Sequence, residues 1–240
     1  MPYILFRNRL GVPLLQERMP EFQTVVEDWG LIDYEQALER QLVWVARVQK
    51  DAYLQALIFC SHPPVATLGR KTKTDDIFAW DGPVVEVQRG GRVTYHGPNQ
   101  IVGYPILNLN ARERRGLKNR DLHGYLRLLE NVLVQSLADF AIEAQSTPSS
   151  ALLAQYKDVE PAGVWVGDRK LGSIGIGVKK WVTYHGFALN LYRDAKAFSG
   201  LRPCGFAPGI AVSAEEVLEK KIDRDEIKQR IESGLTSALC

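Results

Sequence analysis

Cysteine is scarce in this sequence: three thiols, Cys60, Cys204 and Cys240, stand among 240 residues. An odd and widely spaced set is a poor disulfide framework, and no two of the cysteines have the close spacing of a zinc knuckle. We therefore expect free thiols in a reducing compartment, the cytoplasm, and no metal site.

Long apolar runs are missing as well. No window approaches the roughly 20 apolar residues that a membrane-spanning helix needs. The segment Met1–Arg7 lacks a charged region followed by a sustained apolar run, so no secretory signal is expected. No internal repeat of solenoid length stands out. We expect no membrane partner.

The chain also has no excess of one charge, because 30 basic side chains balance 28 acidic ones to a formal net charge of +2. A global field that would attract nucleic acid is therefore absent. A local basic bias exists between Arg112 and Arg120, and Arg70 and Lys71 form a second basic pair. These residues fit either a docking surface for acidic partner proteins or ordinary solvated loops.

The hydrophobic fraction of 45% and the charged fraction of 24% are ordinary for a folded globular protein, which excludes a disordered chain. Strand runs separated by a few isolated helices favour an α+β or mixed α/β fold over strict βαβ alternation. Residues 1–28 are weakly patterned and predict an N-terminal extension, and residues 29–240 predict one domain, with a small C-terminal lobe after Asn190 left open. Helices are expected over 33–49, 121–140 and 223–238, and strands over 54–60, 65–68, 83–88, 101–107, 163–166, 171–178 and 184–191.

A glycine-rich stretch, Arg89 to Gln100, combines two arginines, a histidine and paired glycines. Paired glycines let the backbone approach a ligand closely, and the basic side chains suit phosphate or carbonyl oxygens. A plain glycine hairpin with solvated arginines explains the same residues equally well.

Two later segments place small residues on one face of a strand, where side chains alternate. Ser173, Gly175 and Gly177 share a face in one segment, and Gly186 and Ala188 share a face in the other. Two such stripes predict a shallow trough that would suit an acyl chain. Close packing of a helix against small residues is at least as good an interpretation.

Cys204 is the candidate nucleophile. It lies between Pro203 and Gly205, which predicts a turn and an accessible thiol whose neighbouring backbone N–H at Gly205 is free to approach a reacting oxygen. A free thiol is only a few per cent ionised at pH 7, so a nearby cation is needed for reactivity. Cys60, in contrast, lies inside an apolar run and is interpreted as a buried hydrophobic residue.

These segments together resemble the lipoyl(octanoyl) transferase family. That family has an Arg-Gly-Gly stretch running into Thr-(Tyr/His/Phe)-His-Gly-Pro-Gly-Gln, which this chain matches from Arg89 to Gln100 except for Asn99 in place of glycine. The family's lysine before a small-residue triplet corresponds to Lys170, and its Pro-Cys-Gly corresponds to residues 203–205. Its His-Gly-(Leu/Phe)-Ala-Leu-Asn corresponds to residues 185–190, so the resemblance spans about 180 residues.

The resemblance implies a mixed β-sheet flanked by helices, like the catalytic domain of lipoate and biotin protein ligases. It implies a cysteine–lysine dyad in which Cys204 carries the acyl thioester and Lys170 favours the thiolate. The substrate-binding residues that it implies are Arg89, Gly90, Gly91, Arg92, Val93, Thr94, Tyr95, His96, Ser173, Ile174, Gly175, Gly186, Phe187 and Ala188.

The implied activity is an acyltransferase reaction that needs no cofactor, since a thioester already stores the energy of an amide bond. The donor would be octanoyl-acyl carrier protein, and the acceptors would be lipoyl domains of 2-oxo acid dehydrogenase complexes and the glycine cleavage H protein. Two rivals remain: an ATP-dependent lipoate or biotin protein ligase, and a non-catalytic module that binds lipoyl domains. His96 is interpreted either as a catalytic group or as a residue that orients the glycine turn, and His185 as a buried hydrogen-bonding residue.

Overall fold

A computed structural model describes residues 3–7, 13–17, 21–111, 114, 116–156, 159 and 161–239. Strands β1 (Tyr3–Arg7) and β2 (Pro13–Glu17), described by their backbone, pair antiparallel. Everything that positions the candidate site lies after them.

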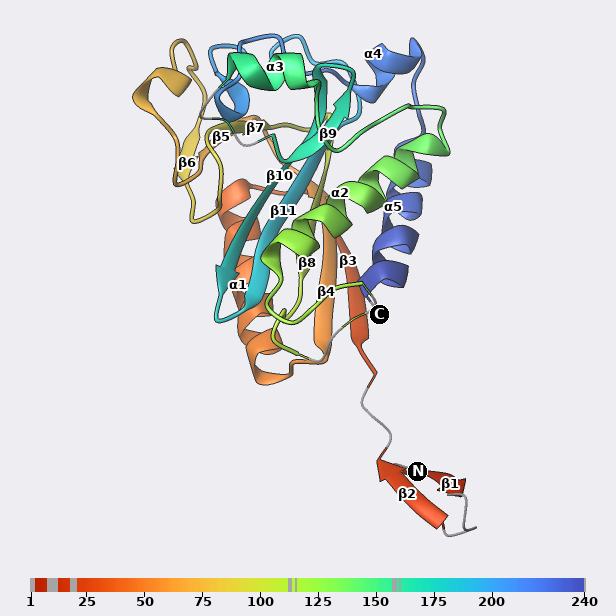
Figure 1. The fold of residues 1–240 in the computed structure, drawn as a ribbon. Coiled ribbons are helices and arrows are strands. Elements are labelled where there is room, and N and C mark those ends of the chain that lie inside the picture. The colour runs from red at the N-terminus through yellow and green to blue at the C-terminus, as the bar shows by residue number, and fades with distance from the viewer. Residues whose placement is uncertain are drawn as a thin grey trace.

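The body of the protein is built on a six-stranded mixed sheet (Figure 1). Strands β3 and β4 run parallel, and each of the other neighbouring pairs runs antiparallel. In spatial order the strands are β3 (Gln23–Leu31), β4 (Leu54–Ser61), β8 (Gln100–Ile106), β11 (Val182–Asn190), β10 (Arg169–Lys179) and β9 (Gly163–Val166).

Helices cover both faces of this sheet. Helix α1 (Tyr34–Lys50) lies on one face, and α2 (Leu122–Ala138) and α5 (Arg224–Leu239) lie together on the other (Figure 1). The carboxylates of Asp33 and Asp121 accept backbone N–H groups in the first turns of α1 and α2, which fixes where each helix begins. The predicted α+β class, with a mixed sheet flanked by helices, is confirmed.

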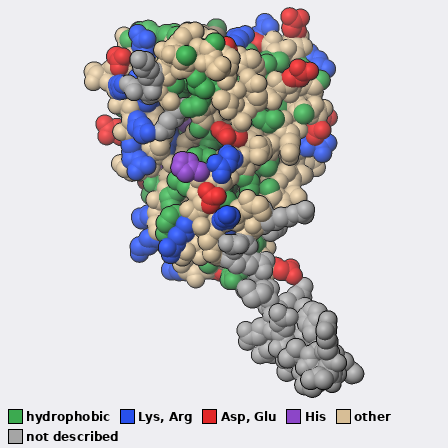
Figure 2. Space-filling view, viewed as in Figure 1, with side chains coloured by type: hydrophobic (Ala, Val, Ile, Leu, Met, Phe, Trp, Pro, Cys, Tyr) green, Lys and Arg blue, Asp and Glu red, His purple; other side chains and the backbone are tan. Residues whose placement is uncertain are grey.

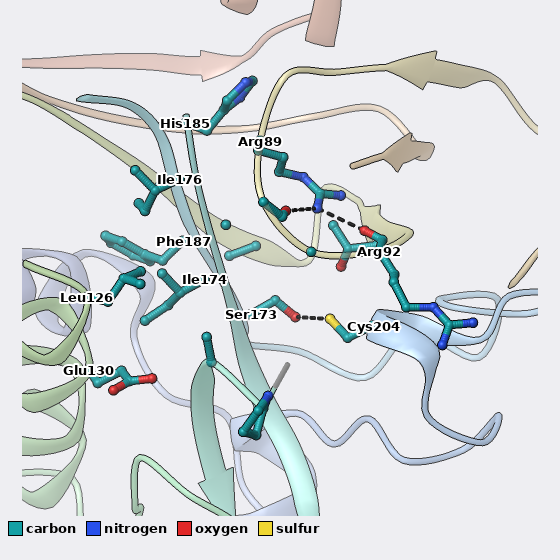
Figure 3. Close-up of a pocket in the computed structure, with 18 of the residues that line it drawn as sticks. Arg89, Arg92, Leu126, Glu130, Ser173, Ile174, Ile176, His185, Phe187 and Cys204 are labelled. Atoms are coloured by element: carbon teal, nitrogen blue, oxygen red, sulfur yellow. Dashed lines mark hydrogen bonds between the residues drawn. The ribbon is translucent and has the colours of Figure 1, made fainter. Parts of the chain in front are cut away.

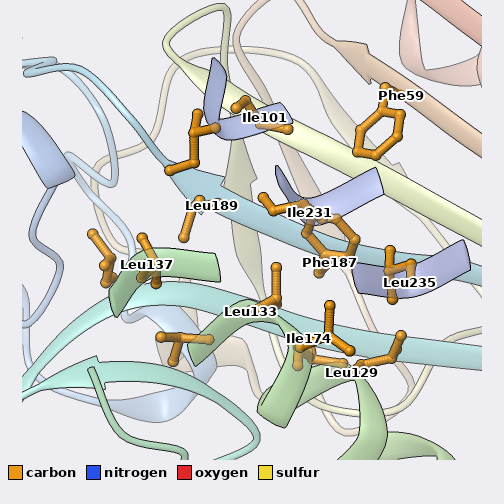
Figure 4. Close-up of a cluster of buried hydrophobic side chains, with 14 of the residues drawn as sticks. Phe59, Ile101, Leu129, Leu133, Leu137, Ile174, Phe187, Leu189, Ile231 and Leu235 are labelled. Carbon is orange, nitrogen blue, oxygen red and sulfur yellow. The ribbon is translucent and has the colours of Figure 1, made fainter. Parts of the chain in front are cut away.

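The larger core lies between the sheet and the α2–α5 pair (Figure 4). Leu129, Leu133 and Leu137 of α2 recur at helical spacing and meet Phe187 and Leu189 of β11. Helix α5 contributes Ile227, Ile231 and Leu235 to the same cluster, so the segment after Asn190 shares this core. A second core on the opposite face packs α1 against β4, β8 and β11.

A small three-stranded sheet, β6–β5–β7, stands beside the larger one. Its strands are β6 (Val84–Glu86), β5 (Val65–Leu68) and β7 (Thr94–His96), and the short helix η1 (Thr74–Asp76) follows β5. Its own minor core contains Ala66, Val93, Tyr95, Phe198 and Leu201. Because β7 lies within the glycine-rich stretch, this small sheet carries that stretch to the edge of the large one.

Three short elements complete the fold: α3 (Ser150–Gln155), the 3₁₀ turn η2 (Pro203–Gly205) and α4 (Ala214–Leu218). The elements expected from the sequence are present, but strands β1, β2, β3 and β7 and helices α3 and α4 were not expected. Strand β3 runs across the predicted boundary at residue 28, and the division into residues 1–28 and 29–240 stays a prediction. Within the described ranges, no helix has both the length and the apolar character that crossing a bilayer requires.

Candidate active site

Cys204 lies in the middle of the η2 turn, in a left-handed conformation with φ 55° and ψ 18°. Such a φ is rare for a residue with a side chain and marks a backbone held by its surroundings. The Cys204 N–H donates to Val93 O at 2.8 Å, which ties the turn to the glycine-rich stretch. The thiol is half-buried, and its Sγ lies 3.9 Å from Ser173 Oγ of β10 (Figure 3). The predicted turn is confirmed.

Gly205 holds the other half of this turn. Its φ of +86° and the 2.3 Å that would separate a Cβ from Arg92 Nη1 both require glycine here. Its N–H donates to Arg202 O at 2.9 Å, and is therefore already engaged. The expectation that this N–H is free for a reacting oxygen is wrong, because the tight turn uses it internally.

The two arginines of the glycine-rich stretch point inward. Arg89 donates from Nη1 to Arg92 O at 2.9 Å and from Nη2 to Thr67 O at 2.8 Å. Arg92 forms a buried ion pair with Asp76, whose carbonyl oxygen also accepts the Arg202 N–H at 2.8 Å. The alternative of solvated arginines is therefore wrong. Arg89 joins the glycine-rich stretch to β5 of the small sheet, and Arg92 joins it to η1, whose Asp76 also contacts the η2 turn.

The small residues of β10 and β11 meet across the two strands, with Ser173 opposite Ala188 and Gly175 opposite Gly186. A Cβ on Gly175 would lie 2.9 Å from Arg89 Cδ, so the Arg89 side chain packs directly over this glycine. The group that packs on Gly175 is therefore an arginine side chain and not the helix that the alternative expected. Arg89 fills the trough at Gly175, and the neighbouring stretch remains open as a cavity.

That cavity has a volume of about 630 Å³, within the usual range for small-molecule sites. One wall is apolar: Leu126 from α2 lies beside Ile174, Ile176 and Phe187 from the sheet (Figure 3), and Leu122 from α2 also lines the cavity. Cys204 and Ser173 lie on the opposite side. A long apolar group attached to Cys204 Sγ could pack against this wall.

Most of the predicted site residues line the cavity, although they come from segments far apart in the sequence. Val93 and Tyr95 do not line it, since alternate residues of a strand face opposite sides and these two face the minor core instead. The predicted residues that line the cavity are Arg89, Gly90, Gly91, Arg92, Thr94, His96, Ser173, Ile174, Gly175, Gly186, Phe187, Ala188 and Cys204.

Lys170 lies near the start of β10, and its side chain is almost completely buried, with 2% of the residue exposed. Its Nζ donates to Ala162 O at 3.0 Å and lies over the rings of Trp165 and Phe206, at 5.0 and 5.6 Å from their centroids. Ala162 lines the cavity, and Phe206 follows Cys204 by two residues. The ammonium group thus lies behind the cavity wall and donates to this carbonyl rather than to the thiol.

The inner end of the cavity is polar and also carries the buried Arg89 guanidinium. Burial lowers the pKa of His185 to about 3 and raises that of Tyr34 to about 12, and it also lowers the pKa of His96 strongly. Tyr34 Oη lies 3.3 Å from His185 Nδ1, which confirms the expectation that His185 forms a buried hydrogen bond. His96 Nδ1, His185 Nε2 and Thr94 Oγ1 are buried without a partner among the described residues, so they can pair with a ligand.

Basic side chains surround the mouth of the cavity. Arg70, Lys71 and Arg127 are exposed and line it, together with the half-buried carboxylate of Glu130. Figure 2 shows basic side chains along this side of the molecule with acidic ones among them. An acidic partner protein would be attracted to such a mouth.

The second basic candidate, Arg112–Arg120, gives a different result. Arg112 and Arg115, with Glu113, lie outside the described residues. Arg114 is buried and donates to Leu239 O at 3.1 Å and Asn108 O at 3.1 Å, so it has a structural role. The docking interpretation for this stretch stays a prediction.

Asn99, the departure from the family pattern, does not take a positive φ. Its carbonyl oxygen accepts the N–H groups of Leu191 and Tyr192 at 3.0 and 3.1 Å, and its side chain donates to Arg193 O at 3.3 Å. Asparagine is therefore accommodated here without backbone strain.

Sequence reasoning missed several cavity residues, notably Tyr34, Tyr104, Leu126 and Glu130. One signal was available: Glu130 stands four residues after Leu126 and eight after Leu122, so it places a charge on an apolar helix face. Both tyrosines lie in segments that share the family resemblance, but nothing in the sequence indicated that their side chains line the cavity.

Comparison with known proteins identifies close relatives over nearly the whole chain. The family model of the lipoyl protein ligase A/B catalytic domain matches residues 33–236. An octanoyltransferase of Bdellovibrio bacteriovorus is 46% identical over 218 residues, which cover 90% of this chain and 98% of that protein. An octanoyltransferase of Bacteroides thetaiotaomicron is 36% identical over 230 residues, covering 89% and 94% of the two chains.

Solved structures with a similar fold are more distant in sequence. A putative lipoate protein ligase from T. acidophilum with bound lipoic acid superposes with a TM-score of 0.66 at 12% identity, covering 92% of this chain and 86% of that one. A lipoate-protein ligase A bound with ATP gives a TM-score of 0.65 at 13% identity, with the same coverage of 92% and 86%. At this level of identity the likeness concerns the fold.

Proposed function

This chain belongs to the lipoyl(octanoyl) transferase family, and on that premise we propose how it moves an octanoyl group from a donor thioester to a lysine of an acceptor protein. We infer that the donor is octanoyl-acyl carrier protein. We infer that the acceptors are lipoyl domains of 2-oxo acid dehydrogenase complexes and the glycine cleavage H protein. The reaction would be the first step of endogenous protein lipoylation, in the cytoplasm, where a free thiol such as Cys204 persists.

The basic mouth of the cavity supports the choice of partners. Acyl carrier proteins and lipoyl domains are typically acidic, and Arg70 and Arg127 are exposed at the mouth. Charges of this kind raise the rate of encounter more than they raise final affinity. They would bring the thioester, and later the acceptor lysine, to the same entrance.

In the first half-reaction, Cys204 Sγ attacks the carbonyl carbon of the donor thioester. The bond from that carbon to the donor sulfur breaks, the departing sulfur would take a proton from Lys170, and the carrier leaves as a thiol. The enzyme then holds the octanoyl group as a thioester on Cys204, and Lys170 is left neutral. Two groups support the thiolate: Ser173 Oγ lies 3.9 Å from Sγ, and the Arg89 guanidinium is close enough for its charge to interact with that of Cys204. Lys170 would favour the thiolate through its positive charge.

In the second half-reaction, the acceptor lysine amine attacks the Cys204 thioester. An amide bond forms, Cys204 leaves as the thiolate, and one proton must be removed from the attacking nitrogen. Lys170 would accept it, because its anionic partner disappears on acylation. Thr94 Oγ1, which is buried and unpartnered at the cavity, would donate to the oxyanion.

The octanoyl chain would lie along the apolar wall formed by Leu126, Ile174 and Phe187 (Figure 3). Burial of a methylene group contributes about 0.8 kcal/mol, so a chain of this length gains substantial binding energy from the wall alone. The observation that carries the proposal is the half-buried Cys204 thiol, held in a strained turn beside this apolar cavity.

Intact mass spectrometry tests the proposal. The purified protein is mixed with octanoyl-acyl carrier protein in the absence of ATP, and the adduct is mapped by peptide analysis at acidic pH, where thioesters survive. We expect one octanoyl group per chain on Cys204, and its loss when a lipoyl domain is added. An adduct on another residue overturns the proposal, a requirement for ATP supports the ligase alternative, and complete absence of an adduct supports the binding module.

A further inference from the structure

Glu130 is a carboxylate on the wall of an otherwise basic and apolar cavity. It continues the cavity-facing stripe of α2 that begins with Leu122 and Leu126 (Figure 3). Glu130 Oε1 accepts a hydrogen bond from the Gly163 N–H at 3.1 Å. The pKa of Glu130 is raised overall, because the effect of burial exceeds the opposing effects of this hydrogen bond and of the Lys170 charge.

The peptide group that Glu130 contacts is the same one that holds Lys170. The Gly163 N–H and the Ala162 carbonyl belong to a single peptide unit, and Ala162 O accepts a hydrogen bond from Lys170 Nζ at 3.0 Å. A negative group therefore lies at the donor end of this peptide, and a positive group lies at its acceptor end. Both charges align with the peptide dipole, so that each hydrogen bond strengthens the other.

Gly163 is built for this arrangement. Its φ of +145° belongs to a region that glycine adopts freely. A Cβ at this position would lie 2.2 Å from Gly172 O and 3.0 Å from Lys170 Cε, so a side chain here would push the lysine away. The bulge between Lys170 and Gly172 on β10 accommodates the same close approach.

We propose that Glu130 is a positioning residue for Lys170, acting through the peptide between Ala162 and Gly163. The inference rests on the proposed function, in that Lys170 is the partner of Cys204. Glu130 holds the peptide carbonyl toward Nζ and supplies the counter-charge of a buried ammonium. Glu130 thus acts on the proposed Cys204–Lys170 pair from behind, and the Ala162–Gly163 peptide connects Glu130 to Lys170.

This arrangement has a consequence for catalysis. The fixed negative charge of Glu130 favours the ammonium form of Lys170 while Cys204 is being acylated. The charged groups that face Glu130 are Lys170 from β10 and Arg127 from its own helix, and burial opposes its ionisation. Loss of the Glu130 charge would leave Lys170 as a buried cation without this counter-charge, so the charged form of the Lys170–Cys204 pair would be less favoured, most visibly at high pH.

Glu130→Gln removes the negative charge but keeps the size of the side chain and an oxygen that can accept the Gly163 N–H. Pre-steady-state acylation of Cys204 by octanoyl-acyl carrier protein would be followed by quenched mass spectrometry between pH 6 and pH 10. We expect the high-pH limb of the rate profile to move down by about one pH unit. On that limb, at pH values above the midpoints of both proteins, the acylation rate should fall about tenfold, while KM for the carrier protein changes less than about twofold.

Two variants sharpen the test. Glu143→Gln removes an equal charge from an exposed position just after α2 and should leave the profile of the wild type unchanged. Glu130→Asp restores the charge and should move the limb most of the way back. A profile for Glu130→Gln that superimposes on the wild type, or an equal shift in Glu143→Gln, overturns the role of Glu130. In both cases the octanoyl adduct on Cys204 still forms, which keeps this failure distinct from failure of the proposed function.

Discussion

Cys60 and Cys204 carry the same thiol in opposite surroundings. Cys60 lies within β4, is 4% exposed, and packs between the sheet and α1. Its Sγ lies 3.5 Å from Nε2 of His62, and burial raises its pKa far above that of a free thiol. Cys204 lies in a left-handed turn at a cavity, with a serine hydroxyl beside Sγ and the charge of Arg89 near it.

The difference shows that reactivity comes from the backbone as much as from the neighbouring charges. A strand places Cys60 among apolar side chains, where burial disfavours the thiolate more than the neighbouring His62 and Tyr104 can favour it. The Pro203–Gly205 turn instead takes Cys204 out of any periodic face and presents it to the cavity. The predictions below test this contrast, starting with the largest expected effect.

Replacement of Cys204 by serine should abolish octanoyl transfer, with a loss on the order of 10³-fold or more, because the hydroxyl is not ionised near neutral pH. Serine fits the same turn, so the melting temperature should change little. The measurement is octanoylation of a lipoyl domain, followed by gel-shift or mass. Retention of activity within tenfold of the wild type would remove Cys204 from the mechanism.

Replacement of Lys170 by methionine, which keeps the buried stem but not the charge, should slow acylation of Cys204 by about 10²-fold. KM for the carrier protein should change little, because Lys170 is buried behind the cavity wall. Lys179→Met, at an exposed position on the same strand, is the matched control. Equal rates for the two variants would show that the ammonium of Lys170 does not act on the thiol.

Replacement of Cys60 by serine should leave transfer within about twofold of the wild type. It should cost about 1 kcal/mol of folding free energy, because a hydroxyl replaces a thiol in an apolar environment. Peptide mapping after a brief exposure to iodoacetamide at pH 8 should find Cys204 labelled and Cys60 protected. Rapid alkylation of Cys60 in the folded protein would contradict the burial that the comparison assumes.

Much of the fold could be predicted because strong periodicity survives in the sequence. Helix α2 repeats leucine at helical spacing and begins at an aspartate cap, and β4 contains a compact apolar run that ends at Cys60. Strand β3 was missed because it pairs on one edge only and leaves Val26 and Leu31 exposed, which weakens any alternation. Helix α4 was missed because five residues hold too few turns to show a period.

The site could be predicted only in part. Its segments were recognisable, but no pattern in the sequence shows that the Cys204 N–H meets Val93 O or that Arg89 covers Gly175. The prediction that Val93 and Tyr95 bind substrate could have been avoided. Side chains alternate along a strand, so if Thr94 and His96 face the cavity, Val93 and Tyr95 face the opposite side. Partnerships across the fold, such as that between Glu130 and Gly163, depend on tertiary structure alone.

Asp76, in the three-residue helix η1, contacts two segments of the active site. It pairs with Arg92 through its side chain and accepts the Arg202 N–H through its carbonyl, so the glycine-rich stretch and the η2 turn share one anchor. That anchor belongs to the small sheet, whose minor core is far slighter than the main one. Local melting of the small sheet would release the nucleophile while the large sheet stays folded, so that heat inactivation and denaturation are separable events in this enzyme.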